Sequence, residues 1–216
     1  MSYTTHADVG GQPGYGRVVP EPEGDPFHAP WEARAMALTL AMGAAGSWNI
    51  DMSRAARETL PDYASLDYWR IWLSALERLL VARGFASADE IASGKMRRPG
   101  LPVPRVLRAD DVPALLARGA PTLRPSTAPA RFAVGDRVRV RSERPDHHTR
   151  LPGYARGRLA TVERSHGVHV FADAHSLGLG EQPHWLYCIV LDPAGATKTQ
   201  HASVSFDAWE PYLEPA

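Results

Sequence analysis

Histidine and cysteine are the residues of this chain that could carry metal or nucleophilic chemistry, and their spacing excludes the common versions of both. Most of the nine histidines lie in the C-terminal half, among them His147, His148, His166, His169, His175 and His184. None of these six forms a helical i, i+4 pair within a metalloprotease motif. The single cysteine, Cys188, rules out an internal disulfide framework and a multi-cysteine zinc site. We therefore expect surface or hydrogen-bonded histidines.

Other catalytic and cofactor patterns are also missing from the sequence. There is no phosphate-binding loop, and Gly178-Leu179-Gly180 lacks the strand and helix that flank a dinucleotide site. No Gly-x-Ser-x-Gly nucleophile elbow occurs. Cys188 lies within the apolar run 186–191, which predicts a buried, unreactive thiol. Taken by itself, the chain contains no complete active site.

Composition and charge describe an ordinary globular protein and exclude several classes of partner. Of 216 residues, 44% are hydrophobic and 22% charged. The 24 basic and 24 acidic residues cancel, so no overall basic field attracts nucleic acid or anionic lipid. The longest weakly polar run, 35–46, is too short to span a bilayer, and residues 1–30 lack the apolar core of a secretory signal. We expect a cytoplasmic protein that binds neither nucleic acid nor membrane.

The elements that must position a site begin with an arm and a helical domain. Residues 1–30 alternate glycine and proline, which predicts an extended arm. Its apolar residues, such as Val18 and Val19, favour contact with a partner chain, and a loose N-terminus is the alternative. Residues 31–95 form a predicted helical domain, with helices over 31–45, 52–59 and 66–83. Asp51 is the predicted N-cap of the second helix. Ser87 and Glu90 form a capping box that predicts a further short helix.

The second half of the chain changes to strand periodicity. Residues 96–130 hold seven prolines and are predicted to be a linker with a short helix near 111–118. Residues 131–216 are predicted to form a β domain, and the expected strands are 137–141, 159–164, 168–171, 185–191 and 203–206. Five short strands with turn residues between them predict a small closed barrel. The expected fold class is therefore α+β.

Several specific motifs follow one another along nearly the whole chain. They are Asp8-Val9-Gly10-Gly11, Gly14-Tyr15-Gly16, Phe27-His28-Ala29-Pro30-Trp31-Glu32, Asp67-Tyr68-Trp69 with Leu76-Glu77-Arg78-Leu79-Leu80, His148-Thr149-Arg150-Leu151-Pro152-Gly153-Tyr154-Ala155-Arg156-Gly157, His166-Gly167, Phe171-Ala172-Asp173, Gly180-Glu181 and the closing 209–216. In this order they resemble the beta subunit of nitrile hydratase. The resemblance implies an SH3-like barrel at the C-terminus and an arm that wraps around a partner.

The resemblance also implies where the missing active site lies. Nitrile hydratases hydrate a nitrile to the primary amide, and the family pairs this kind of chain with an alpha subunit in an obligate αβ unit that forms α2β2. The alpha subunit holds Co(III) or Fe(III) through a cysteine cluster in which two cysteines are oxidised. This chain, with one cysteine, cannot supply that cluster and is expected to bind no metal of the family's kind. The sequence leaves open which metal is used, which nitrile is preferred, and whether metal hydroxide or the sulfenate is the nucleophile.

Six residues of this chain match site positions of the family. By resemblance, Arg54 and Arg150 donate to the oxidised cysteines of the partner, and Tyr68 points its hydroxyl into the site. Trp48, Ile50 and Trp72 fall near positions that line the substrate channel. A guanidinium suits the first role because it stays charged and offers several donors in a rigid plane. Core packing is the alternative for the three channel positions and for Tyr68, and a surface ion pair is the alternative for the two arginines.

Three alternative functions remain. A thiocyanate hydrolase assembly resembles the same family, but there the two halves occur as separate chains, and the continuous segment 96–130 disfavours it. The second alternative is a non-catalytic accessory protein that delivers metal to the alpha subunit. Such proteins resemble only the N-terminal half of this chain, so the presence of the C-terminal half disfavours this alternative. An SH3-like barrel that binds nucleic acid is suggested by nine arginines against four acids in 131–164. The two aromatic residues there, Phe132 and Tyr154, are few for stacking on single strands.

Overall fold

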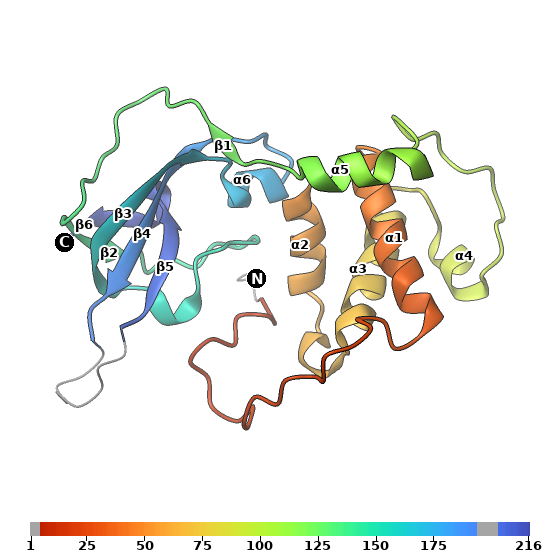
Figure 1. The fold of residues 1–216 in the computed structure, drawn as a ribbon, viewed down its shortest axis with the longest axis horizontal. Coiled ribbons are helices and arrows are strands. Elements are labelled where there is room, and N and C mark those ends of the chain that lie inside the picture. The colour runs from red at the N-terminus through yellow and green to blue at the C-terminus, as the bar shows by residue number, and fades with distance from the viewer. Residues whose placement is uncertain (1–4, 194–202) are drawn as a thin grey trace. The chain divides into compact units, whose positions relative to one another are not determined.

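The computed structural model describes residues 5–193 and 203–216, and the chain divides into two compact units. We call residues 5–119 the helical unit and residues 120–193 with 203–216 the sheet unit (Figure 1). The first four residues of the predicted arm and residues 194–202 of the predicted barrel lie outside the described residues. The mixture of helices with an antiparallel sheet confirms the α+β class.

The helical unit contains five α-helices among its described residues. They are α1 (Pro30–Ala44), α2 (Ile50–Glu58), α3 (Tyr68–Ala82), α4 (Ala88–Ser93) and α5 (Val112–Arg118), with short 3₁₀ helices at Tyr63–Ser65 and Ala109–Asp111. The core of the unit is formed by Trp48 with residues of α2 and α3, including Ala56, Ala75, Leu76 and Leu79. The apolar residues of α3 recur every three or four positions, so one face of this helix is buried.

Side-chain caps fix the starts of two helices. Asn49, and not the predicted Asp51, is the N-cap of α2, because its side chain accepts a 2.8 Å hydrogen bond from the backbone N–H of Met52. Asp51 lies in the first turn instead, where its charge complements the helix dipole. The capping box of Ser87 and Glu90 at the start of α4 is confirmed in both of its hydrogen bonds.

The arm lies along the helical unit at its two ends and is exposed between them. Residues 5–29 form neither helix nor strand, and residues 10–26 are all exposed. Near its start, Thr5 donates to the backbone carbonyl of Glu58 at the end of α2. Near its end, the ring of Phe27 lies 5.0 Å from that of Trp69, whose indole N–H donates to the carbonyl of Pro26. The arm is therefore anchored by its ends.

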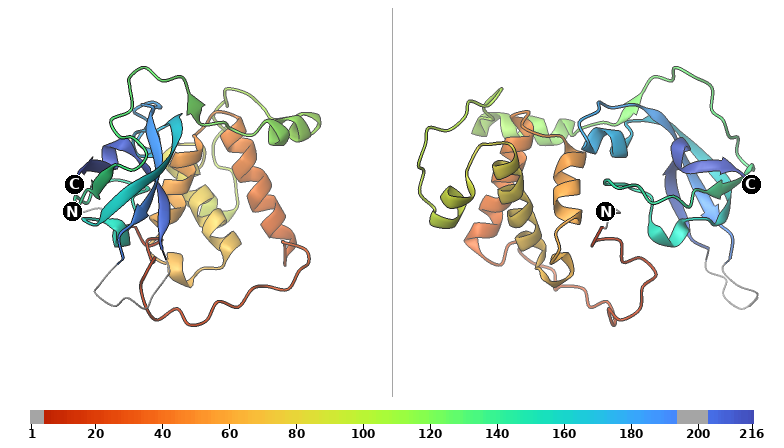
Figure 2. Two further views of the ribbon diagram at one scale, coloured as in Figure 1. Left: turned by 60° about the vertical axis from the view of Figure 1, so that its left-hand side comes forward. Right: turned by 180° about the vertical axis from the view of Figure 1, so that it is seen from behind.

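The sheet unit is a six-stranded antiparallel sheet with one short helix. Its elements are β1 (Leu123–Arg124), β2 (Arg137–Val140), β3 (Leu159–His169), α6 (Ala172–Ser176), β4 (His184–Leu191), β5 (Ser205–Trp209) and β6 (Leu213–Pro215), with 3₁₀ turns at Gly153–Ala155 and Glu210–Tyr212. The strand order is β5-β4-β3-β2-β6, with β1 paired to β3, and these strands lie side by side in all views (Figure 2). Val138, Val140, Tyr187, Ile189 and Leu213 fill the core on one face.

Two features of the sheet differ from the sequence prediction. β3 is one long strand where two short ones were predicted, because bulges at 162–164 and 165–167 bend it without ending it. Within the described residues the two ends of the strand path, β5 and β6, do not pair, so closure into an SH3-like barrel is not confirmed. β1 was not foreseen within the segment 96–130, and the division into arm, helical domain, linker and barrel stays a prediction.

The helices in the described part of the chain are short. α1 and α3 have 15 residues each, and no described helix combines the length and the apolar run that a bilayer crossing requires.

Candidate functional site

Arg54 lies in the middle of α2 and is oriented by acids of its own helix. Its guanidinium is 3.4 Å from a carboxylate oxygen of Asp51, one turn before it, and 4.0 Å from one of Glu58, one turn after it. The Arg54 side chain is 37% exposed. Because both partners are set by helical spacing, the position of Arg54 follows from α2 alone.

A second arginine and two aromatic side chains lie beside Arg54. The guanidinium of Arg57 lies over the ring of Trp72 in α3, 4.3 Å from its centroid. The ring of Tyr68, the first residue of α3, is 6.0 Å from the ring of Trp72. Burial lowers the pKa of Arg57, and the charge of Arg54 lowers it further. The interaction with Tyr68 raises this pKa. The structure thus brings Arg54, Tyr68 and Trp72 into one neighbourhood within the helical unit.

Arg57 is a residue of this neighbourhood that the sequence analysis missed. Its Nε donates to the carbonyl of Ser53, which fixes the guanidinium against α2. The available signal was its spacing, because a residue three positions after Arg54 lies on the same side of a helix. Two guanidinium groups offer donors and no acceptors, so this surface can bind anionic oxygen atoms.

The two other predicted channel residues differ sharply in exposure. Trp48 is buried in the core of the helical unit, among the side chains of α2 and α3. Ile50, the first residue of α2, is 51% exposed. Tyr68 is more open still, at 62%. Ile50 and Tyr68 can therefore contact a ligand directly, whereas Trp48 contributes chiefly to packing.

Arg150 belongs to the sheet unit and lies in the loop between β2 and β3. The residue is exposed, but its backbone is tied to buried side chains. Its N–H donates to Oδ1 of Asp173 at 3.3 Å and to the hydroxyl of Tyr212 at 3.1 Å. Asp173 comes from α6 and Tyr212 from the 3₁₀ turn before β6. Two distant segments therefore fix this backbone position, leaving the side chain at the surface.

Asp173, Tyr212 and Thr149 form a buried polar cluster beneath this loop. The hydroxyl of Tyr212 donates to Oδ1 of Asp173 and accepts from Thr149 at 3.3 Å. Thr149 in turn accepts from the N–H of Leu151. Asp173 is 5% exposed, and burial raises its pKa although the hydrogen bonds oppose this. Burial and the neighbouring carboxylate raise the pKa of Tyr212 as well, so its hydroxyl stays protonated as a donor.

A cavity of about 410 Å³ adjoins the same cluster within the sheet unit. Thr149, Asp173 and Tyr212 line it together with Leu151 and Phe171. Arg141, Arg144 and Arg156 add positive charge to its lining, and Glu143 and His147 add further polar groups. The cavity can therefore accept a polar or anionic group next to the loop that carries Arg150.

Cys188 agrees with its prediction as a buried thiol. It lies in β4 and is 6% exposed. Burial raises its pKa, and neighbouring carboxylates raise it further, so the sulfur stays protonated at neutral pH. An uncoordinated Cys188 is therefore a poor nucleophile.

The sequence matches models of a known protein family in both halves of the chain. The family model of the nitrile hydratase beta subunit N-terminal domain matches residues 3–112, and that of the C-terminal domain matches residues 121–215. The chain belongs to the nitrile hydratase beta subunit family.

Relatives of this family resemble the chain from end to end. The chain is 35% identical to the low-molecular weight cobalt-containing nitrile hydratase subunit beta of Rhodococcus rhodochrous, with 97% of this chain and 98% of the relative covered. It is 34% identical to the nitrile hydratase subunit beta of Pseudomonas putida, at 97% and 98% coverage. Among solved structures, a thiocyanate hydrolase from Thiobacillus thioparus is 29% identical and covers 41% of this chain and 78% of its own, with a TM-score of 0.38. That TM-score is too low to support an inference about fold.

Proposed function

We propose that this chain is the beta subunit of a nitrile hydratase, an enzyme that adds water to a nitrile to give the primary amide. The observation that carries the proposal is the match to nitrile hydratase beta subunits over nearly the full length, both domains included. The residue roles in this proposal rest on motif positions together with local geometry.

The partner in this proposal is a nitrile hydratase alpha subunit that carries the metal. With one cysteine, this chain does not fit a site built from a cluster of cysteines, so the Co(III) or Fe(III) ion belongs to the partner. When bound there, the metal supplies Lewis-acid activation of a small nitrile substrate. Relatives whose names include cobalt support a metal-containing enzyme. We further propose a cytoplasmic α2β2 assembly and an SH3-like barrel for the sheet unit, whose β3 bulges favour curvature.

Arg54 and Arg150 are proposed to donate to the oxidised cysteine oxygens of the partner. Sulfenate and sulfinate oxygens are anionic acceptors, and a free sulfenate is prone to further oxidation. Both arginines are accessible to a partner surface, because the Arg54 side chain is 37% exposed and Arg150 is an exposed residue of an anchored loop. A charge-assisted hydrogen bond of this kind contributes about 1.5–3 kcal/mol, and an unpaired buried anion costs more.

Tyr68, Ile50 and Trp72 are proposed to face the substrate. The exposure of Tyr68 and Ile50 leaves them accessible to a ligand, and the Tyr68 hydroxyl can donate to a polar atom of it. Trp72 supplies an aromatic wall, and the Arg57 guanidinium stacked on its ring holds it in place. Trp48, buried in the same core, is proposed to support this wall by packing.

The exposed arm is proposed to lie on the alpha subunit. Val18 and Val19 are among the most exposed apolar residues of the chain, although the arm has fixed contacts at both ends. Exposed apolar side chains on an otherwise extended segment are typical of a surface that a partner covers.

Co-expression with an alpha subunit tests the proposal. The complex should contain one tightly held cobalt or iron ion per αβ pair at the alpha-subunit site and release amide from a small nitrile. Arg54→Lys and Arg150→Lys should each lower the rate by roughly 10- to 150-fold, because a lysine keeps the charge and loses the planar donor set. Arg118→Lys, on an exposed arginine at the end of α5, is the matched control.

Three outcomes would count against the assignment. Parental rates in both lysine variants, with normal assembly, would remove the role of the two arginines. Hydrolysis of thiocyanate without hydration of nitriles would favour the thiocyanate hydrolase alternative. Recovery of RNA, with no protein partner, would favour a nucleic-acid-binding barrel.

A further inference from the structure

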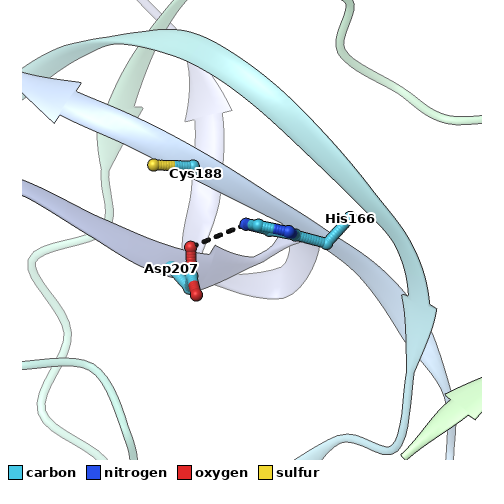
Figure 3. A group of neighbouring side chains, drawn as sticks. All are labelled: His166, Cys188 and Asp207. Atoms are coloured by element: carbon cyan, nitrogen blue, oxygen red, sulfur yellow. Dashed lines mark hydrogen bonds and ion pairs between the residues drawn. The ribbon is translucent and has the colours of Figure 1, made fainter.

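One outer face of the sheet unit gathers three metal-binding residue types from three adjacent strands. His166 lies on β3, Cys188 on β4 and Asp207 on β5 (Figure 3). One donor atom of each, the imidazole nitrogen, the thiol sulfur and a carboxylate oxygen, lies within 4.8 Å of the other two. None of these residues has a role in the proposed nitrile chemistry.

Strand register and one glycine produce this arrangement. Cys188 is paired directly with Asp207 across β4 and β5, so their side chains leave the same face. The neighbours of Cys188 in β4, Tyr187 and Ile189, fill the core, which places the sulfur on the opposite face. The second bulge of β3 ends at Gly167, whose φ of 92° is reached by glycine without strain. The imidazole of His166, which lies in this bulge, reaches Oδ1 of Asp207 on β5 at 2.8 Å.

These three donor types together favour a divalent cation that is intermediate between hard and soft. Thiolate, imidazole and carboxylate together suit Zn²⁺, whereas Mg²⁺ and Ca²⁺ prefer oxygen alone. Glu163 lies outside the group of three, but its Oε2 is 3.4 Å from the sulfur of Cys188, so rotation of this side chain can bring in a fourth donor. Neighbouring donors in a tetrahedral zinc site lie roughly 3.3–3.8 Å apart, given ligand bonds of about 2.0–2.3 Å. The observed spacing needs only side-chain rotation, and the Asp207 side chain is exposed enough to allow it.

The charges around the sulfur are also those of a cation site. Without a metal, the group consists of a His166 to Asp207 contact of 2.8 Å and a thiol that donates to Glu163. A divalent cation would satisfy both carboxylates and stabilise the thiolate at once.

We propose that His166, Cys188 and Asp207, with Glu163 as the fourth donor, bind one Zn²⁺ ion or a similar borderline divalent cation. Binding replaces the S–H bond of Cys188 by an S–Zn bond and releases that proton to solvent. No electron is transferred, since zinc is redox-inert. The ion ties β3, β4 and β5 together on the face opposite the core.

Cobalt(II) is the probe for this site, because its thiolate complexes absorb in the near ultraviolet and its tetrahedral complexes absorb in the visible. The full-length chain, stripped with a chelator and desalted, is titrated with Co²⁺. One equivalent should produce both bands, and one equivalent of Zn²⁺ should remove them. Since Cys188 is the single cysteine of the chain, the thiolate band reports on this residue alone.

Variants separate this site from nonspecific histidine binding. Cys188→Ser should abolish the thiolate band, and His166→Ala should weaken binding by at least about tenfold. His175→Ala, which removes a histidine from α6, is the matched control and should bind as the parent does. Asp207→Asn is the variant least able to disturb folding, because the Asp207 side chain is exposed. It should weaken metal binding while the circular dichroism spectrum stays unchanged. Absence of a thiolate band in the parent, or equal affinity in the parent and His166→Ala, would overturn the proposal.

Discussion

Arg54 is oriented by acids three and four positions away on its own helix, whereas Arg150 is held by side chains that follow it by 23 and 62 residues. The contacts of Arg54 are partly exposed ion pairs, and those of Arg150 are hydrogen bonds to buried groups. In the helical unit, regular geometry and a small apolar core therefore position the proposed site residues. In the sheet unit, a buried polar cluster does so. The two units should respond differently to substitution.

The largest expected effect is on the stability of the helical unit, where truncation of a buried side chain is compared with truncation of a half-exposed one. Trp48→Ala should destabilise this unit by about 3–5 kcal/mol, because it leaves a cavity in the core. Ile50→Ala should cost less than about 1 kcal/mol, since the side chain is half exposed. Urea unfolding followed by tryptophan fluorescence and circular dichroism measures both. Equal losses in the two variants would show that Trp48 is no core residue.

The second prediction removes the hydroxyl at the centre of the buried cluster. In Tyr212→Phe, the carboxylate of Asp173 loses a hydrogen-bond donor and the backbone N–H of Arg150 loses an acceptor. The free energy of unfolding of the sheet unit should therefore fall by about 1–3 kcal/mol. In the αβ complex, kcat should fall while KM stays close to the parental value, because the loop that presents Arg150 is loosened. Tyr154→Phe, at a partly exposed tyrosine of the same unit, is the control. A parental kcat with reduced stability would confine Tyr212 to a structural role.

The third prediction concerns the pH dependence of the same cluster. Burial raises the pKa of Asp173 above its ordinary 3.8, so the folded state keeps a proton that the unfolded chain gives up first. Stability from this group is therefore present at low pH and decreases as the pH rises through the raised value. Asp173→Asn lacks this loss, and its stability relative to the parent should rise across that window by about 1.4 kcal/mol per unit of pKa shift. Unfolding between pH 3 and pH 7 tests the sign, and a constant difference would contradict it.

The smallest effect is expected for the acids beside Arg54. Glu58→Gln removes a contact of 4.0 Å between partly exposed groups, so stability should change by less than about 0.5 kcal/mol. The rate of the αβ complex should stay within about twofold of the parent, because α2 itself still positions Arg54. A large loss of rate would mean that Arg54 depends on its acids as Arg150 depends on its buried cluster. Chemical denaturation and amide release measure the two quantities.

The features that the sequence predicted well are local. The period of the apolar residues in α3, the capping box at Ser87 and the alternation in β2 each depend on residues a few positions apart. The choice of Asp51 as N-cap was wrong by two positions, because both Asn49 and Asp51 are good caps and the backbone selects between them.

The features that the sequence missed depend on distant contacts. Nothing near Arg150 indicates that Asp173 and Tyr212 bind its backbone, because that pairing arises only when α6 and the final turn pack together. The open path of the sheet, the single β3 and its bulges likewise follow from strand pairing. Cys188 was correctly predicted to be buried, but its neighbours His166 and Asp207 come from other strands and could not be assigned from spacing.

The arm also bears on how cells would handle a copy of this chain that has found no alpha subunit. Residues 10–26 bury little against the chain's own helices, so a protease could bind and cut this stretch without unfolding anything first. Once a partner covers the stretch, the same cleavage would require dissociation. Surplus copies would then be cleared selectively, and the balance between the two subunits would be corrected after synthesis.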